Sequence, residues 1–366
     1  MIKKLFVLLI GLNSLIFANL DLVYTYNTPS EKGDLSNQTQ EEHGLENYYP
    51  STDKLLGFVG LEFLYWKAIE GASDWAVKGQ KGLPEQNVGQ LGEFHTAKFN
   101  WDPGYRLKIG VQFPPHFWEL LGDYTYYHTS RHQKVDTPDL SLITASTGPS
   151  LIGTFPQFTD SGVIVAHMNT HLNYNGANLT LGKVFLISKS MLFRPYIGVT
   201  GAWMKEEWRF KYIGTSIATN KQKWKFHGGG MRIGFDLDWL IGLGFSLDSK
   251  FSIASILGSY HQKSYSYTNN TGPDETGIPD LVQDARLHDN RIATNLQFFL
   301  GPSYNRNFSS CGFKIFLGYE LNTWFNLHET IQPVNFSPRS IDNRYTNLKR
   351  GVLAFHGLTS GLTLSF

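Results

Sequence analysis

The chain has 366 residues, and its 32 Lys and Arg against 31 Asp and Glu give a formal net charge of +1. This balance argues against a nucleic-acid-binding surface, which needs an excess of basic residues. Charged residues make up only 17%, against roughly 25% in soluble domains, while aromatics reach 14% and glycines number 36. The single cysteine, Cys311, excludes a disulfide scaffold and a cysteine-based zinc cluster. The composition thus points away from an ordinary soluble enzyme.

The first residues have the features of a secretory signal peptide, which we place at residues 1–18. Lys3 and Lys4 form a basic start, an apolar stretch follows, and Ala18 supplies a small residue at the expected cleavage point. The stretch of about 13 apolar residues is shorter than the roughly 20 that a membrane-spanning helix needs. Residues 19–56 are polar and without periodicity, so we expect a flexible lead-in or a partial plug. Residues 57–366 then hold the folded domain of an exported protein.

From residue 57 onward the dominant pattern has a period of two, which is typical of β-strands. In residues 104–113 every odd position is apolar and every even position is polar or glycine. A helix would scatter these charges all round its surface. Near Asn175 and Gly176 the apolar residues change from even to odd positions, and we expect a β-bulge there. Ten strands are predicted, at residues 58–67, 97–113, 117–128, 167–186, 192–212, 223–238, 243–265, 288–301, 312–326 and 348–366.

The links between these strands alternate in length, as they do in outer-membrane barrels with short periplasmic turns and long extracellular loops. An even strand number places both ends of the barrel on the periplasmic side, and a terminal aromatic such as Phe366 is usual for a closing strand. We therefore predict a transmembrane antiparallel up-and-down β-barrel of about ten strands (twelve if a loop hides a hairpin) in a bacterial outer membrane. The short links are 114–116, 187–191, 239–242 and 302–311, and the long ones 68–96, 129–166, 213–222, 266–287 and 327–347.

In such a barrel the apolar faces contact lipid, and the charged faces line the lumen. Closure is obligatory, because an open strand edge in hydrocarbon leaves backbone groups unpaired. Seven positive and six negative charges predict weak ion selectivity, although in a narrow barrel they could instead form a closed core of salt bridges. The predicted lumen-lining charges are Glu62, Arg106, Lys108, Glu119, Asp123, Arg194, Arg232, Asp236, Asp248, Lys250, Arg291, Lys314 and Glu320. The predicted membrane-interface aromatics are Tyr65, Trp66, Trp118, Tyr126, Trp203, Trp239, Trp324 and Phe366.

Several segments are distinctive: LEFLYWKA at residues 61–68, FNWDPGYR at 99–106, RPYIG at 194–198 and HGLT at 356–359. Together, in this order along the chain, they resemble the Legionella-type major outer membrane protein family, pore-forming β-barrels also found in chlamydia-like bacteria. The resemblance runs from about residue 61 to the end. It implies an abundant outer-membrane barrel with porin-like activity, a passive pore for small hydrophilic solutes or ions. It carries over no catalytic residues.

The twelve histidines invite an interpretation as metal ligands. His128 and His132, like His167 and His171, have helical metal-site spacing, but both pairs fall in strand ends or loops. The sequence contains neither GxSxG nor HExxH. We therefore expect no metal site, no cofactor and no enzyme activity.

Two alternatives to a pore remain open. One is a surface adhesin or structural antigen that acts through the long extracellular loops. The other is an outer-membrane barrel protease with His128, His132, Asp136 and Asp139 at its rim. The expected partners are outer-membrane lipid, small hydrophilic solutes and the barrel-assembly machinery, which would bind the C-terminal strand ending in Phe366. We expect no nucleic acid, and the sequence is compatible with a homo-oligomer.

Overall fold

The computed structural model describes residues 55–79, 92–113, 118–136, 151–153, 163–188, 190–214, 216–270, 280–308, 311–333 and 346–366. The expected signal peptide and nearly all of the lead-in lie outside these residues. In the described part, no helix is long and apolar enough to cross a bilayer. The elements are β1 (Leu56–Glu70), β2 (Asp74–Gly79), β3 (Gly92–Thr96), β4 (Trp101–Phe113), β5 (Trp118–Asp136), β6 (Leu151–Gly153), β7 (Val165–Lys183), β8 (Phe185–Ser188), β9 (Met191–Ile213), β10 (Ser216–Gly242), β11 (Phe245–Asn270), β12 (Asp280–Asn307), β13 (Gly312–Pro333) and β14 (Thr346–Ser365).

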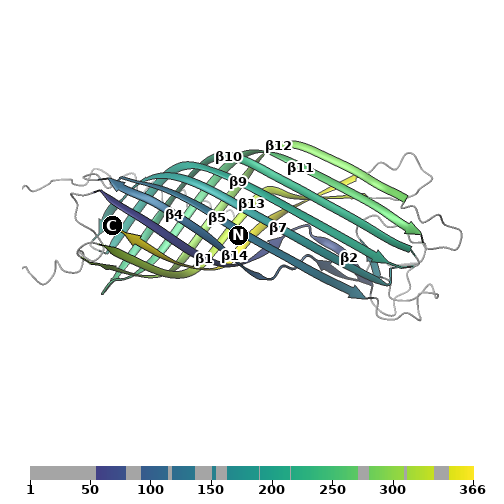
Figure 1. Cartoon of the computed structure of the whole chain (residues 1–366), viewed down its shortest axis with the longest axis horizontal. Helices are drawn as coiled ribbons and strands as arrows, with labels where there is room; N and C mark the ends of the chain where they lie inside the picture. The colour runs from purple at the N-terminus through teal and green to yellow at the C-terminus, as the bar shows by residue number, and fades with distance from the viewer. Residues whose placement is uncertain are drawn as a thin grey trace, which may run out of the picture. The chain divides into compact units, whose positions relative to one another are not determined.

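Ten of these strands form a closed antiparallel barrel, as the sequence predicted (Figure 1). The order round the wall is β1, β4, β5, β7, β9, β10, β11, β12, β13 and β14. Pairing of β14 with β1, for example Leu362 with Leu61, closes the ring. The short strand β8 pairs with the start of β9 and adds no further member to the ring. Closure satisfies the backbone groups that an open edge would leave unpaired in lipid.

The two ends of the barrel differ in their connections. At one end, here the turn end, short links join β4 to β5, β8 to β9, β10 to β11 and β12 to β13. The chain's C-terminus lies there as well, where the backbone of Phe366 exchanges two 2.9 Å hydrogen bonds with that of Gly57. The remaining five connections meet at the opposite, loop end. This agrees with the predicted arrangement except at one link.

The prediction of a long loop at residues 213–222 is wrong. Only residues 214 and 215 separate β9 from β10, and residues 216–222 continue β10 between β9 and β11. Three polar residues of this segment, Thr219, Asn220 and Gln222, are buried, and Asn220 and Gln222 find partners inside the barrel. Gln222, for example, donates from Nε2 to the carbonyl oxygen of Ile331 on β13 at 2.7 Å.

A small three-stranded sheet of β2, β3 and β6 is built from two loop-end connections. Trp75 and Ala76 on β2 are fully buried, in the same apolar cluster as the barrel residue Tyr212. The hydroxyl of Tyr212 donates to the carbonyl oxygen of Trp75 at 2.7 Å. Figure 1 shows β2 at the end of the barrel opposite the C-terminus. The small sheet therefore packs against inward-facing side chains of the barrel at the loop end.

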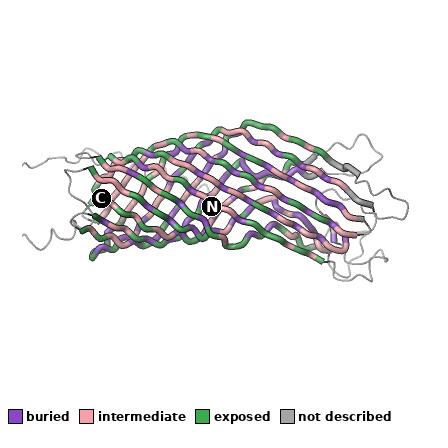
Figure 2. The backbone as a smooth tube through the Cα atoms, in the orientation of Figure 1, coloured by how far each residue is buried: buried purple, intermediate pink, exposed green. Residues whose placement is uncertain are grey.

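The apolar face of the wall changes sides along the strands. On β9, Ile197, Val199 and Trp203 are exposed on the outer face near the turn end. Further along the same outer face lie Lys205, Glu207, Arg209 and Lys211, while the inner positions become Met204, Trp208, Phe210 and Tyr212, all buried. The alternation of exposed and buried residues is visible in Figure 2. The turn-end half is thus apolar outside, and the loop-end half is apolar inside.

This change explains the pattern near Asn175 and Gly176, where a bulge was predicted. The prediction of a bulge is wrong, because β7 pairs with β5 and β9 in unbroken register through this region. Leu172 is buried in the lumen, whereas Leu179 is exposed on the outer face. The apolar residues move from the inner to the outer face, and the backbone keeps its period.

The strands are longer than a bilayer requires. β12 has 28 residues, which at about 3.3 Å per residue and a tilt of about 40° span roughly 70 Å along the barrel axis. The hydrocarbon core of a bilayer is only about 30 Å thick. The turn-end half carries the apolar outer band, so the loop-end half extends beyond the membrane.

Candidate functional site

A cavity of about 330 Å³ occupies the turn-end half of the lumen, and we call it the charged chamber. It extends from Arg106 to the turn end, where Leu56, Asn307 and Ser365 line it. Six cationic and six anionic side chains face it from seven of the ten barrel strands, because the inner positions of this half are polar. They are Arg106, Lys108, Arg194, Arg232, Lys250 and Lys314, and Glu62, Glu119, Asp123, Asp236, Asp238 and Glu320.

The deepest part of the charged chamber is a group of ion pairs around Arg106. Its guanidinium group lies 2.7 Å from Glu62 on β1 and 2.7 Å from Glu320 on β13. Its Nε also donates to the hydroxyl of Thr125 at 2.8 Å. Lys108 forms a second ion pair with Glu62. Opposite charges are therefore matched in this deepest part of the chamber, as buried charges require.

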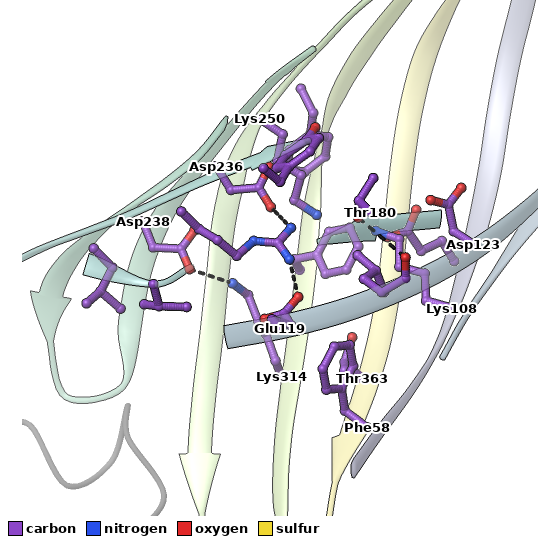
Figure 3. Close-up of a pocket in the computed structure, with 18 of the residues that line it drawn as sticks. Phe58, Lys108, Glu119, Asp123, Thr180, Asp236, Asp238, Lys250, Lys314 and Thr363 are labelled. Atoms are coloured by element: carbon purple, nitrogen blue, oxygen red, sulfur yellow. Dashed lines mark hydrogen bonds and ion pairs between the residues drawn. The ribbon is translucent and has the colours of Figure 1, made fainter. Parts of the chain in front are cut away.

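Two further groups lie nearer the turn end (Figure 3). Arg194 bridges Glu119 on β5 and Asp236 on β10. Lys314 lies 3.2 Å from Asp238 and 2.6 Å from Asp248, and Figure 3 shows its ammonium group directed at Asp238. These bridges join neighbouring strands, or strands two or three positions apart in the ring, and leave a lining with balanced charge.

Eleven of the thirteen predicted lumen charges face the charged chamber. Asp248 is fully buried beside Lys314, and Arg291 lies further toward the loop end, 3.1 Å from Glu329. The sequence reasoning missed Asp238. It occupies an even position of β10, like Arg232 and Asp236, so the period of two would have found it.

Beyond the charged chamber the lumen is filled by five buried rings, here called the aromatic layer: Trp66, Tyr127, Tyr174, Trp324 and Phe355. Phe355 lies centrally, 6.1 Å from Trp66, 5.4 Å from Tyr127 and 5.2 Å from Tyr174 between ring centroids. Tyr174 on β7 also meets Trp324 on β13 at 5.8 Å. These strands are opposite in the ring, so this contact crosses the full width of the lumen.

The prediction that Trp66 and Trp324 lie at the membrane interface is wrong, because both belong to the aromatic layer. On β1 and β13 the odd positions near the turn end face outward, so the even-numbered tryptophans face inward. The other six lie on the outer side. Tyr65, Trp118, Trp203, Trp239 and Phe366 are exposed, and Tyr126 is half-buried beside the exposed Tyr105.

The predicted protease candidates do not form a catalytic group among the described residues. His128 and His132 on β5 face outward and bond through Nδ1 to the side-chain oxygens of Asn173 and Asn169. Asp136 pairs with Lys134 at 3.0 Å, and Asp139 lies outside the described residues. The described members thus bond to partners other than one another.

The closed antiparallel barrel, its outer apolar band and its polar lumen define a bacterial outer-membrane β-barrel protein. A family model described as the Legionella pneumophila major outer membrane protein precursor matches residues 49–366, and the chain belongs to this family. The protein is therefore an outer-membrane protein. The search of curated proteins found no match.

Solved structures of low sequence identity also match this chain over most of its length. The outer membrane protease OmpT from Escherichia coli is 9% identical with a TM-score of 0.38, and the match covers 87% of this chain and 99% of that one. A major outer membrane protein from Thermus thermophilus is 10% identical, with a TM-score of 0.32 and coverage of 85% and 99%. The Pseudomonas putida toluene transporter TodX is 8% identical, with a TM-score of 0.28 and coverage of 87% and 91%.

Proposed function

We propose that the protein is a narrow, weakly selective outer-membrane pore for small hydrophilic solutes or ions. The observation that carries this proposal is the charged chamber, which lies in the half of the barrel with the apolar outer band. Contact with lipid requires apolar residues only on the outer face of the wall. It does not explain why twelve charged side chains face the lumen. A lining of this kind suits hydrated ions, which its fixed charges attract and release.

The balance of the lining supports weak selectivity. Six cations face six anions, and most of them are held in ion pairs such as Arg194 with Glu119. Lys250 instead lies over the rings of Phe299 and Phe316, at 5.1 and 4.9 Å from their centroids. With equal numbers of both signs, neither cations nor anions gain a large advantage.

The aromatic layer determines how large and how frequent we expect the conductance steps to be. In the conformation described, its rings and the small sheet of β2, β3 and β6 occupy the lumen between the charged chamber and the loop end. Ten strands enclose a narrow interior, in contrast with the open lumens of 16–18-stranded porins. We therefore expect small, infrequent conductance steps that require side chains of the aromatic layer or the small sheet to move.

The test is to reconstitute the full-length protein into planar bilayers. Stepwise conductance, with a reversal potential close to zero in a salt gradient, is the expected result. Absence of steps from several folded preparations, and from variants in which the aromatic layer is thinned, would reject pore function. Large, permanently open steps would contradict the closed layer.

A second candidate function is attachment or antigen presentation at the cell surface. It is favoured by the outer face of the loop-end half, which extends beyond the apolar band and carries Lys205, Arg209, Lys211, Lys223 and Lys225. Such a wall extends beyond the membrane and presents basic side chains outside it. Removing residues 137–150 should reduce binding to host cells while leaving conductance unchanged if this function operates. Equal binding by the shortened protein would exclude these residues as the attachment site.

A further inference from the structure

Three ionisable side chains meet inside the loop-end half, away from the charged chamber. They are Glu70 on β1, Glu206 on β9 and His328 on β13, with one potential ligand atom of each within 4.8 Å of the others. In the ring of strands, β1 and β13 are two apart, and β9 is four from either. The three side chains therefore converge from well-separated parts of the wall. No short sequence motif could have revealed this group, because its members come from three distant strands.

The group is buried, and the side chains of two of its members, Glu70 and His328, have no hydrogen-bond partner among the described residues. Glu70 is 7% exposed, His328 1% and Glu206 0%. Among the described residues, neither carboxylate oxygen of Glu70 and neither ring nitrogen of His328 has a hydrogen-bond partner. The Nδ1 atom of His328 lies 3.4 Å from Glu206 Oε2, without hydrogen-bond geometry. Four buried polar atoms of Glu70 and His328 thus lack a hydrogen-bond partner among the described residues, which is rare in a folded protein unless something binds them.

Glu206 is fixed in place by its surroundings. Its two carboxylate oxygens accept hydrogen bonds from the indole nitrogens of Trp208 and Trp224. The ring of Trp208 also packs against His328, with centroids 5.4 Å apart. These contacts hold two of the three side chains in position, as partners of metal ligands do.

The charge of the group is unbalanced within the part of the chain that the structure describes. Two carboxylates lie close together among apolar rings, and the buried cation Arg291 is already 3.1 Å from Glu329 and stacked over Tyr260 at 3.8 Å. Buried carboxylates without a counter-charge are costly. A divalent cation between them would cancel both charges and supply the missing partner of His328.

We propose that Glu70, Glu206 and His328 bind one divalent transition-metal ion of the zinc type. Carboxylate oxygen and imidazole nitrogen are ligands that zinc accepts, at about 2.0–2.2 Å. Small side-chain rotations from the present separations bring the three atoms onto one ion. Since the site is enclosed, the ion is structural: it ties β1, β9 and β13 together behind the aromatic layer. This inference does not depend on pore function.

The test uses the full-length folded protein in detergent, stripped with a chelator and titrated with Zn²⁺ alone. The wild type is expected to bind one Zn²⁺ per chain and to unfold at a higher temperature with zinc. The variants Glu70→Gln and His328→Gln should each weaken zinc binding by at least about tenfold. Glu70→Gln removes one of two like charges with little change of volume, so it is expected to fold. The matched control is Glu329→Gln, which alters a neighbouring buried glutamate outside the group.

Each outcome decides the proposal. Failure of the wild type to bind Zn²⁺ would overturn it, and so would unchanged binding in Glu70→Gln, which would place the ion on surface histidines such as His261 and His288. Zinc X-ray absorption of the wild type gives a readout independent of the variants. One imidazole with oxygen ligands is expected, and a shell of several imidazoles would contradict the assignment.

Discussion

The rings of Tyr174 and Trp324 lie 5.8 Å apart, in an edge-to-face arrangement, although their strands are five positions apart in either direction round the wall. A contact of this kind can form only if side chains fill the barrel from wall to wall. It separates the charged chamber from the loop-end half of the lumen, where large apolar and aromatic side chains are buried. The two halves should therefore respond differently to substitution.

Thinning the aromatic layer should raise conductance. Replacing Phe355 by Ala removes the ring that contacts Trp66, Tyr127 and Tyr174, so the variant should give larger or more frequent steps in planar bilayers than the wild type. Such a truncation costs about 3–5 kcal/mol, so folding must be verified by the heat-dependent shift of the barrel on gels. Trp239→Ala, on the outer face, is the control and should leave conductance unchanged. Equal conductance in both variants would show that the layer is not the barrier.

Removing Arg106 should destabilise the barrel strongly. Arg106→Met leaves the buried carboxylates of Glu62 and Glu320 without their shared partner, which costs about 3–5 kcal/mol. Chemical unfolding in detergent, followed by tryptophan fluorescence, measures this loss. Adding Glu320→Gln to the same chain should restore part of the stability, because one unpaired charge disappears. If wild type and Arg106→Met unfold at the same denaturant concentration, the ion pairs do not stabilise the barrel.

Cysteine labelling should reveal which half of the wall leaves the membrane. The native Cys311 is exposed at the turn end, so it should react with a membrane-impermeant maleimide only after the outer membrane is permeabilised. In a Cys311→Ser background, Lys225→Cys should be labelled on intact cells, since this position is exposed on the outer face toward the loop end. Ile233→Cys, on the same face of β10 within the apolar band, should not be labelled. Labelling of Cys311 on intact cells would reverse the orientation of the barrel.

Two adjacent glycines of β10 should respond differently to alanine. A Cβ atom at Gly230 would collide with the backbone oxygen of Ser255 on β11, which cannot move without breaking the sheet. We expect Gly230→Ala to cost about 1–3 kcal/mol of folding free energy. At Gly229 the nearest atom to a Cβ is the oxygen of Thr200 at 3.7 Å, so Gly229→Ala should be tolerated. Refolding yield and thermal unfolding in detergent compare the two, and equal stability would refute the close strand approach at Gly230.

The membrane half of this protein could be predicted from its amino-acid sequence alone. Lipid on one side and water on the other impose a strict period of two, so residues 104–113 were sufficient to predict the strand. The inward direction of Arg106 and Lys108 followed only when the export signal, the terminal Phe366 and the alternating link lengths were added. The same rule placed Trp203 and Trp239 on the outer face. The ten strands and most of their alternating connections followed from repeating this reasoning along the chain.

The loop-end half could be understood only from the three-dimensional structure. There the wall leaves the lipid, both faces meet protein or water, and the apolar residues turn inward, so Trp66, Leu172 and Trp324 change roles while the backbone period continues. The convergence of Glu70, Glu206 and His328 depends on which strands stand opposite one another once the ring closes. Local sequence reports the period of each strand. It does not report what lies across the lumen, because contacts between opposite strands exist only in the closed barrel.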